Sequence, residues 1–235
     1  MFAAGERARG FLRAGWAAGL VAAVMHLFAE ANGAATIALV AKPVPALLLA
    51  AAVFRSGRSA LRLPVFAGLL ASAVGDVLIQ RPGGFLSGLA AFLVAHVCYV
   101  SGFWRARRDA LWLRALPVAL FGAFMASRLA GGLAAAGLPV RIGVIVYILA
   151  ICTMLWRAAA LVGAPGFDRS VGRLALGGAI VFAASDSLIA IHRFVEPLSW
   201  SDVPIMVLYW AGQLGIAGAA MAATRSASGA PAPAR

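Results

Sequence analysis

Two aspartates stand in segments that are otherwise small and apolar, and their carboxyl groups are the first candidates for chemistry. Asp76 lies in GLLASAVGDVLI (68–79), and Asp186 lies in GAIVFAASDSLIAI (178–191). A carboxylate in hydrocarbon is costly, so an acid at such a position usually faces a protein-lined cavity and serves a function. We therefore expect Asp76 and Asp186 to belong to one site.

Other polar side chains lie in apolar segments at a similar depth. Because a helix rises about 1.5 Å per residue, depth can be counted from the basic residue at the helix end. Asp76 follows Arg62, and Asp186 follows Arg173, by a stretch that places both acids about 20 Å from the arginine-rich end. The same count places four more polar residues within about 7 Å of that depth: Lys42, His96, Tyr209 and Gln213.

This set of residue types indicates acid–base chemistry. Lys42 can neutralise only one of the two acids, and a protonated acid beside an ionised one is the arrangement that acid–base catalysis uses. Ser72 lies one turn before Asp76 on the same helix face, and Tyr99 shares a face with His96. The alternative is a structural ion pair in which Lys42 only holds helices together.

The composition requires a membrane setting for these residues. The chain is 63% hydrophobic and only 12% charged, whereas soluble domains are about half apolar and a quarter charged. We predict an all-α, polytopic integral membrane protein. The net charge of +12 does not indicate nucleic-acid binding, because the arginines fall in short gaps between apolar runs, which is the pattern of membrane topology.

Eight apolar runs are long enough for spanning helices, which need about 20 residues each. They are approximately 14–31, 34–54, 63–80, 84–104, 111–132, 138–157, 173–193 and 202–222. We expect them to form one transmembrane domain over residues 1–222, followed by a disordered cytoplasmic tail at 223–235 that has no core-forming residues.

The distribution of arginine orients this bundle. Fifteen arginines fall on one side of the eight runs, and the other side carries only Arg81, Arg128, Arg141 and Arg193. Positive residues favour the cytoplasm, so both termini are expected there. Residues 7–31 also resemble a signal peptide, but cleavage would leave seven spans and break the alternation of charge. We therefore expect this segment to be retained.

With these residues in order, the chain resembles the YhhN-type lysoplasmalogenase family of integral membrane alkenyl ether hydrolases, over about residues 36 to 220. The resemblance rests on six features: KPVPALLLA (42–50), Ser72-x-x-Gly75-Asp76, FLVAHVCYV (92–100), Tyr147, FAASDSLIAI (182–191) and YWAGQLGI (209–216). It implies hydrolysis of the vinyl ether bond of lysoplasmalogens to a fatty aldehyde and a glycerophospho-ethanolamine or -choline.

That reaction suits the residues. Vinyl ether hydrolysis needs a proton donor for the β-carbon and a negative charge for the oxocarbenium ion, and two carboxyl groups can supply both. One of Asp76 and Asp186 is expected to be the general acid and the other the base, in an order that the sequence leaves open. The expected supporting or substrate-binding residues are Lys42, Ser72, His96, Tyr99, Tyr147, Ser185, Tyr209 and Gln213. No cofactor or metal is required, the partners are a lysophospholipid and the bilayer, and the expected location is a bacterial inner membrane.

Two other functions fit parts of the pattern. A zinc-dependent lipid hydrolase resembling alkaline ceramidases would need three convergent ligands, whereas His26, His96 and His192 come singly from separate runs. A proton-coupled transporter would use intramembrane acids. However, no spans in matching halves carry a mid-helix Pro or Gly interruption, and the pair Pro43 and Pro45 occurs only in the second run.

Overall fold

The computed structural model describes the backbone of residues 2–228 and the side chains of residues 15 and 17–224. This part of the chain forms nine α-helices and one short 3₁₀ helix. In order they are α1 (Phe2–Ala31), α2 (Ala35–Ala41), α3 (Val44–Arg55), α4 (Arg62–Ile79), α5 (Phe85–Ala106), η1 (Trp112–Ala115), α6 (Leu116–Ala135), α7 (Leu138–Leu161), α8 (Arg169–Phe194) and α9 (Asp202–Ser228). Because α9 continues to Ser228, the tail predicted from residue 223 is helical at its start, and residues 229–235 lie outside the described part.

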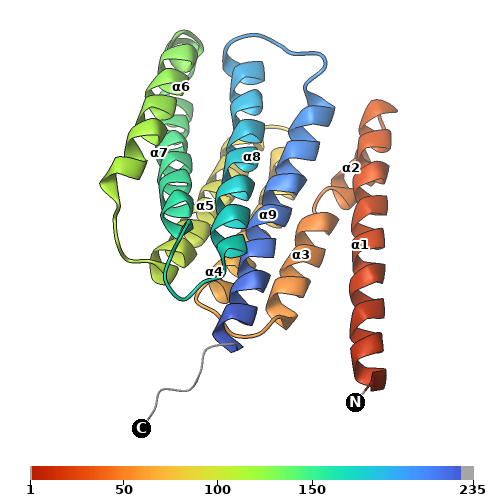
Figure 1. The fold of residues 1–235 in the computed structure, drawn as a ribbon. Helices are drawn as coiled ribbons and strands as arrows, with labels where there is room; N and C mark the ends of the chain where they lie inside the picture. Colours follow the sequence, from red (N-terminus) through yellow and green to blue (C-terminus); the bar gives the residue numbers. More distant parts are fainter. Residues whose placement is uncertain (1, 229–235) are drawn as a thin grey trace.

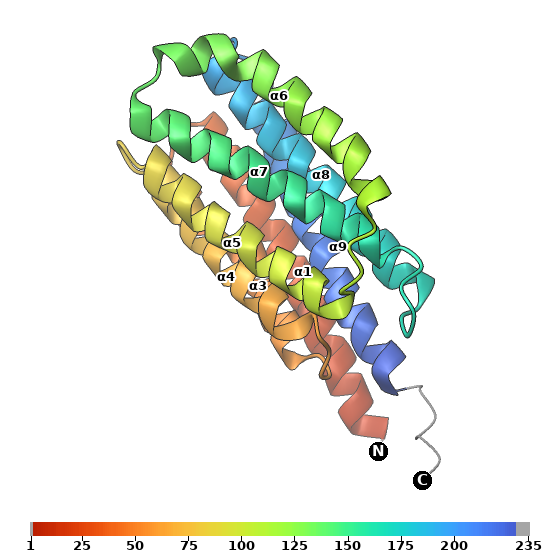
Figure 2. The ribbon, with the colours of Figure 1, turned by 90° about the vertical axis from the view of Figure 1, so that its left-hand side faces the viewer.

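The helices run up and down in one bundle, with α1 at its edge (Figures 1 and 2). Seven segments among the described residues are long and apolar enough to cross a membrane: 35–55, 62–79, 85–106, 112–135, 138–161, 169–194 and 202–224. Within α1, the described apolar stretch is the shorter Ala17–Ala31. The chain is therefore a polytopic helical membrane protein, as the composition predicts.

Large apolar side chains cover the outside of the bundle. Leu20 and Phe28 on α1 are 69% and 70% exposed, and Leu113 beside α6 is 90% exposed. In water such a surface would drive aggregation. In a bilayer it is the surface that meets lipid, because every spanning helix already satisfies its own backbone hydrogen bonds.

The second predicted span is broken rather than continuous. The run expected at 34–54 forms α2 and α3, with Lys42 and Pro43 between them (Figure 1). Proline has no N–H to donate and its ring crowds the preceding turn, and here Pro43 and Pro45 stand two residues apart. The interruption sets Lys42 at a helix junction inside the membrane-spanning segment.

Glycines allow the helices that carry the two aspartates to approach their neighbours closely. A Cβ at Gly178 of α8 would lie 2.7 Å from the backbone nitrogen of Ile216 and 2.8 Å from the carbonyl oxygen of Gly212, both on α9. On α4, a Cβ at Gly68 would overlap the ring of Tyr99. Small residues at membrane helix interfaces serve this kind of close packing.

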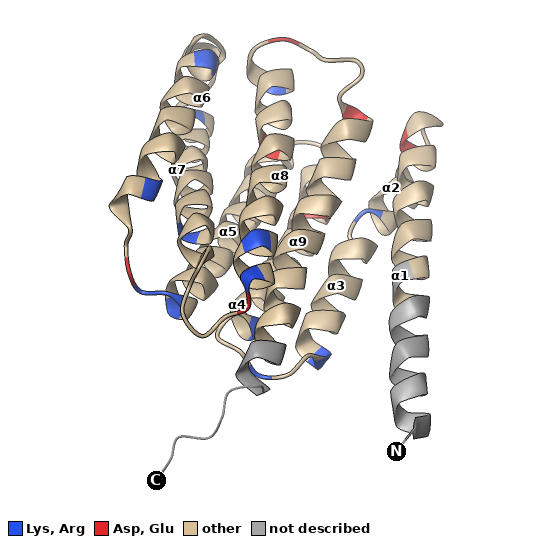
Figure 3. Cartoon of the chain, in the orientation of Figure 1, with Lys and Arg blue, Asp and Glu red and all other residues tan. Residues whose placement is uncertain are grey.

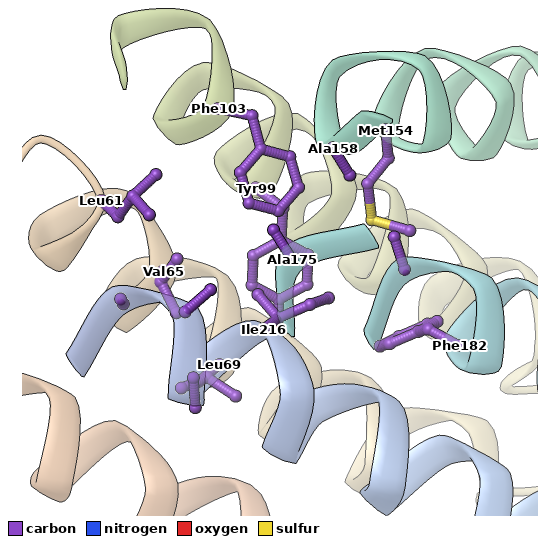
Figure 4. Close-up of a cluster of buried hydrophobic side chains, with 14 of the residues drawn as sticks. Leu61, Val65, Leu69, Tyr99, Phe103, Met154, Ala158, Ala175, Phe182 and Ile216 are labelled. Carbon is purple, nitrogen blue, oxygen red and sulfur yellow. The ribbon is translucent and has the colours of Figure 1, made fainter. Parts of the chain in front are cut away.

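The end of the bundle that holds the α3–α4 connection is filled by side chains. Leu61 directly before α4, Val65 of α4, Phe103 of α5, Met154 of α7 and Ala175 of α8 are all fully buried and pack into one cluster (Figure 4). Most of the blue segments in Figure 3 lie toward this same end, whereas at the other end the loop between α8 and α9 and the start of α9 each carry a red segment. We call these the packed half and the hollow half, because the cavities described next lie in the second.

Candidate active site

A narrow cavity of about 100 Å³ opens among α4 to α9 in the hollow half. Most of its wall is apolar, with residues such as Leu89, Phe121, Met125 and Val144. Its polar lining consists of Lys42, Asp76, Tyr147, Ser185, Asp186, Ser187 and Tyr209. We call it the apolar cavity. The structure therefore brings the two predicted aspartates, from helices that are far apart in sequence, to a single space.

Asp76 is fully buried on α4 and is held by the last helix of the bundle. The hydroxyl of Tyr209 on α9 donates a hydrogen bond to Asp76 Oδ2 over 2.8 Å. The other carboxyl oxygen, Oδ1, has no hydrogen-bond partner among the described residues. A buried polar atom left without a partner is costly, so Oδ1 is a natural point of contact for water or substrate.

Asp186 on α8 contacts two other side chains, those of Tyr147 and His96. The hydroxyl of Tyr147 on α7 donates to Asp186 Oδ2 over 3.1 Å. The Nε2 atom of His96 on α5 lies 3.5 Å from the same oxygen. The side chain of Asp186 is 10% exposed, so this carboxyl group is buried but reachable from the cavity.

The backbone fixes which nitrogen of His96 carries a hydrogen. His96 Nδ1 lies 2.8 Å from the carbonyl oxygen of Phe92, and a carbonyl oxygen only accepts, so Nδ1 is the donor. In a neutral imidazole the other nitrogen, Nε2, is then an acceptor. Because Nε2 faces a carboxyl oxygen, which also carries lone pairs, the contact is favourable only with a proton between the two groups.

Phe182 separates the two carboxyl clusters. Its ring is fully buried and makes edge-to-face contacts with His96, Tyr99 and Tyr209, at centroid distances of 5.1, 6.3 and 5.4 Å. Such contacts fix ring orientations, so Phe182 positions the histidine of one cluster and the tyrosine of the other. Phe182 was not among the predicted site residues. Its place one turn before Asp186 was the available signal.

Four predicted supporting residues lie beside the cavity rather than in its wall, and His96 is one of them. Ser72 and Tyr99 are buried and their hydroxyl oxygens are 3.3 Å apart. Gln213 is buried one turn after Tyr209. Ser185 does line the cavity, but its hydroxyl donates to the carbonyl oxygen of Ile205 over 2.8 Å and so ties α8 to α9.

The three histidines are not gathered into one site. His26 donates from Nδ1 to the carbonyl oxygen of Ala38 over 3.0 Å, and His192 Nδ1 accepts from the backbone N–H of Leu198 over 3.0 Å. Within the described residues, no group of three or more histidine, cysteine, aspartate or glutamate side chains is placed to hold a metal ion. The zinc-hydrolase alternative therefore has no ligand set in this part of the chain.

Known proteins resemble this chain in sequence over most of its length. The statistical description of the YhhN family matches residues 37–220. A lysoplasmalogenase of Mycobacterium bovis is 33% identical over 228 residues, which cover 87% of this chain and 84% of that protein. The lysoplasmalogenase TMEM86A of Homo sapiens is 33% identical over 161 residues, covering 65% of this chain and 63% of that protein.

A third relative, the lysoplasmalogenase TMEM86B of Sus scrofa, is 32% identical over 148 residues, covering 62% of this chain and 58% of its own length. The chain thus spans about three fifths of the length of the animal relatives that it matches. No solved structure matches the chain.

Proposed function

The chain belongs to the YhhN family, and from this premise and the geometry of the cavity we propose that it hydrolyses the vinyl ether bond of lysoplasmalogens. The products would be a fatty aldehyde and a glycerophospho-ethanolamine or -choline. One observation carries the proposal at the level of residues. Two carboxyl groups from different helices, each held by a tyrosine hydroxyl, meet at one cavity with an apolar wall.

The reaction needs two groups of opposite protonation state. A general acid protonates the β-carbon of the vinyl ether and so forms an oxocarbenium ion. Water then adds to the cation as a base takes its proton. The resulting hemiacetal collapses when the base returns that proton to the leaving glycerol oxygen and the hemiacetal hydroxyl gives its own proton back to the acid. The sum is one alkenyl ether and one water converted to one aldehyde and one alcohol, with both carboxyl groups returned to their starting states.

We assign the general acid to Asp186. Its Oδ2 faces the acceptor nitrogen of His96 across 3.5 Å, so this pair holds one proton between two acceptors at the edge of the cavity. After that proton has moved to carbon, the carboxylate and Nε2 face each other with no proton between them, so the pair readily takes up the hydroxyl proton that the hemiacetal releases when it collapses. The hydrogen bond from Tyr147 keeps the carboxyl group in place during both steps.

Asp76 is then the ionised partner. Its carboxylate accepts from Tyr209, it shares the cavity wall with the cationic Lys42, and its Oδ1 has no partner among the described residues. A fixed negative charge in a poorly hydrated cavity stabilises a developing cation strongly. The same oxygen would accept the proton of the attacking water and later return it to the leaving glycerol oxygen.

The deciding experiment measures aldehyde release by the purified full-length protein in detergent. The substrates are an alkenyl lysophospholipid and its saturated alkyl analogue. We expect aldehyde from the alkenyl lipid only, and in D₂O we expect one deuterium on the carbon next to the carbonyl group. Asp186→Asn and Asp76→Asn should each lower kcat by a factor of about 10² to 10⁴, the usual contribution of an acid–base group.

Asp109→Asn is the matched control, because Asp109 is 67% exposed on a connecting loop outside the cavity. Its kcat should equal that of the wild-type protein. A folded wild-type protein that releases no aldehyde would overturn the proposed function. Equal losses in Asp109→Asn and Asp186→Asn would overturn the assignment of the residues.

We also infer eight spans, with both termini on the cytoplasmic side of a bacterial inner membrane. This inference is supported by α1, whose 30 residues are about 45 Å long, and by the arginine asymmetry between the two ends. An alkaline phosphatase reporter should be active when fused after Glu196 and inactive when fused after Arg235. Activity at both positions, or at the second alone, would contradict the topology.

A further inference from the structure

A second, larger cavity adjoins the first in the hollow half. Its volume is about 810 Å³, against about 100 Å³ for the apolar cavity. It lies among the end of α1, α2, the ends of α4 and α8, and the start of α9. The two cavities share six wall residues: Lys42, Ile79, Phe85, Ile189, Ile205 and Met206. We call the larger one the polar cavity.

The polar cavity carries charges of both signs. Its cationic lining residues are Lys42 and Arg193, and its anionic ones are Glu30 and Asp202. The wall of the apolar cavity contains Lys42 and the two site aspartates but no second basic residue. A space with separate cations and anions suits a zwitterion that presents a phosphate at one end and an amine at the other.

Two features show that the cations are available to a ligand. Lys42 is half-buried at the helix break, and within the described residues no carboxylate oxygen lies within the 4 Å of an ion pair with it. Arg193 stacks on Phe85, with its Cζ 3.8 Å from the ring centroid. That contact holds the guanidinium group flat and leaves its N–H edge for a phosphate, which arginine binds with two parallel hydrogen bonds.

We propose that the polar cavity binds the phosphoethanolamine head group of a single-chain lipid, with its phosphate against Lys42 and Arg193 and its ammonium against Glu30 and Asp202. This inference rests on the proposed function, because it places the head group of that substrate. The hydrocarbon chain would lie against the apolar wall of the apolar cavity.

The shared wall explains how this arrangement would select the scissile bond. In an alkenyl lysophospholipid only the glycerol backbone separates the vinyl ether oxygen from the phosphate. Lys42 belongs to both cavities, and Asp76 and Asp186 stand in the wall of the apolar one. A phosphate held at Lys42 would therefore place the vinyl ether at the junction, beside the two carboxyl groups.

The lining also favours ethanolamine over choline. A quaternary ammonium is typically held by a cage of aromatic faces. The only aromatic residues of the polar cavity are Phe85, which Arg193 already covers, the histidines, and Trp200. Carboxylates such as Glu30 and Asp202 instead match the three N–H donors of a primary ammonium group.

The test combines binding with turnover in the full-length protein. The binding probe is the non-cleavable alkyl ether lysophosphoethanolamine, measured by calorimetry in detergent. The turnover substrates are alkenyl lysophosphoethanolamine, alkenyl lysophosphocholine and the phosphate-free alkenyl glycerol. We expect Arg193→Gln to raise both the Kd of the probe and the KM of the phospholipids about tenfold, to leave alkenyl glycerol unaffected, and to be largely rescued by Arg193→Lys.

The ammonium side is tested by the double variant Glu30→Gln with Asp202→Asn. It should remove the preference for ethanolamine over choline, measured as the ratio of the kcat/KM values for the two phospholipids. Arg81→Gln and Glu196→Gln are matched controls, because both side chains are exposed at the same end of the bundle and outside the polar cavity. Both controls should behave as the wild-type protein.

The outcomes separate this inference from the proposed function. Aldehyde release with unchanged KM and Kd in Arg193→Gln would overturn the head-group site and leave the hydrolase standing. Binding of the probe that depends on Arg193, without any aldehyde release, would support the head-group site and overturn the hydrolase. An equal preference for choline in the wild-type protein would overturn the ammonium assignment.

Discussion

The packed half and the hollow half of the bundle are built from the same helices, but side chains fill the interior of the first and cavities lie in the interior of the second. In the packed half, Leu61, Val65, Phe103 and Met154 are fully buried and line neither cavity. In the hollow half the same helices enclose two cavities, and Asp76 and Asp186 stand in the wall of one of them. The difference indicates that the packed half fixes the helix positions, while the hollow half keeps the space in which a substrate can be held.

Arg157 is a buried charged residue of the packed half, and backbone carbonyl groups and an aromatic ring hold it in place. Its side chain is fully buried on α7, and its guanidinium donates to the backbone carbonyl oxygens of Arg107 and Asp109. It also lies over the ring of Trp104, 4.2 Å from the centroid. Two of its three guanidinium nitrogens therefore have carbonyl partners, and Nε has none among the described residues. Asp76 Oδ1 in the hollow half also has none there, but unlike Arg157 it belongs to a residue that lines a cavity.

The comparison makes its largest prediction in the hollow half. His96→Gln removes the nitrogen that faces Asp186 and should lower kcat about a hundredfold, which corresponds to about 2.7 kcal/mol. The melting temperature should change little, because glutamine still fills much of the space. Steady-state aldehyde release and thermal melting in detergent measure the two effects. Tyr99→Phe is the control, since its hydroxyl contacts Ser72 outside the cavity wall, and a similar loss of kcat there would contradict the assignment.

The next effect is expected where α8 and α9 meet, and it should act on stability. Gly178→Ala forces a Cβ against the backbone of α9 and should lower the free energy of unfolding by about 2 kcal/mol, a usual cost of overpacking. Chemical unfolding in detergent measures this change.

The neighbouring glycine is the matched control for this substitution. A Cβ at Gly177 would meet nothing within 4 Å, and replacing a helical glycine by alanine stabilises by up to about 1 kcal/mol. The two variants should therefore move stability in opposite directions. A Gly178→Ala protein as stable as Gly177→Ala would show that the α8–α9 contact is looser than described.

A smaller loss of stability is expected for Arg157→Gln. The substitution leaves the carbonyl oxygens of Arg107 and Asp109 with fewer donors, at a cost of about 1–2 kcal/mol. The kcat of the folded protein should equal that of the wild type, because Arg157 lines neither cavity. Arg108→Gln, at an exposed position, serves as the control for loss of charge. A fall in kcat in Arg157→Gln but not in Arg108→Gln would contradict a purely structural role for the packed half.

The smallest effect concerns the N-terminus of α8, outside the spanning segments. Hydrogen bonds from the side chain and the backbone N–H of Ser170 hold the pKa of Asp168 below its ordinary value of 3.8. A lowered pKa means that the ionised cap stabilises the folded state at neutral pH. This contribution should fade as the pH falls through 3.8 toward the lowered value.

Thermal melting of the wild type and of Asp168→Asn between pH 3 and 7 tests this prediction. Asparagine caps a helix about as well as aspartate but does not titrate. The wild type should therefore lose slightly more stability than Asp168→Asn on acidification. Parallel pH profiles for the two proteins would show that the cap does not depend on its charge.

The sequence was sufficient for the membrane class and for the level of the two acids. Apolar runs of about 20 residues have few stable solutions other than spanning helices, and the fixed rise of a helix converts residue number into depth. Depth estimates were less accurate for His96. They placed it about 6 Å below Asp186, yet the side chains meet across 3.5 Å, because helices tilt and their basic ends lie at different heights.

Only the tertiary structure decided which side chains form hydrogen bonds with each other. The sequence did not show that Tyr209 serves Asp76 and Tyr147 serves Asp186, or that Ser72 and Tyr99 lie behind the cavity wall. Helix periodicity predicts which residues share a face. Which neighbouring helix that face contacts depends on close packing such as that at Gly178. The break at Lys42 and the adjoining polar cavity have the same origin, since both depend on how α1, α2, α8 and α9 are placed around one another.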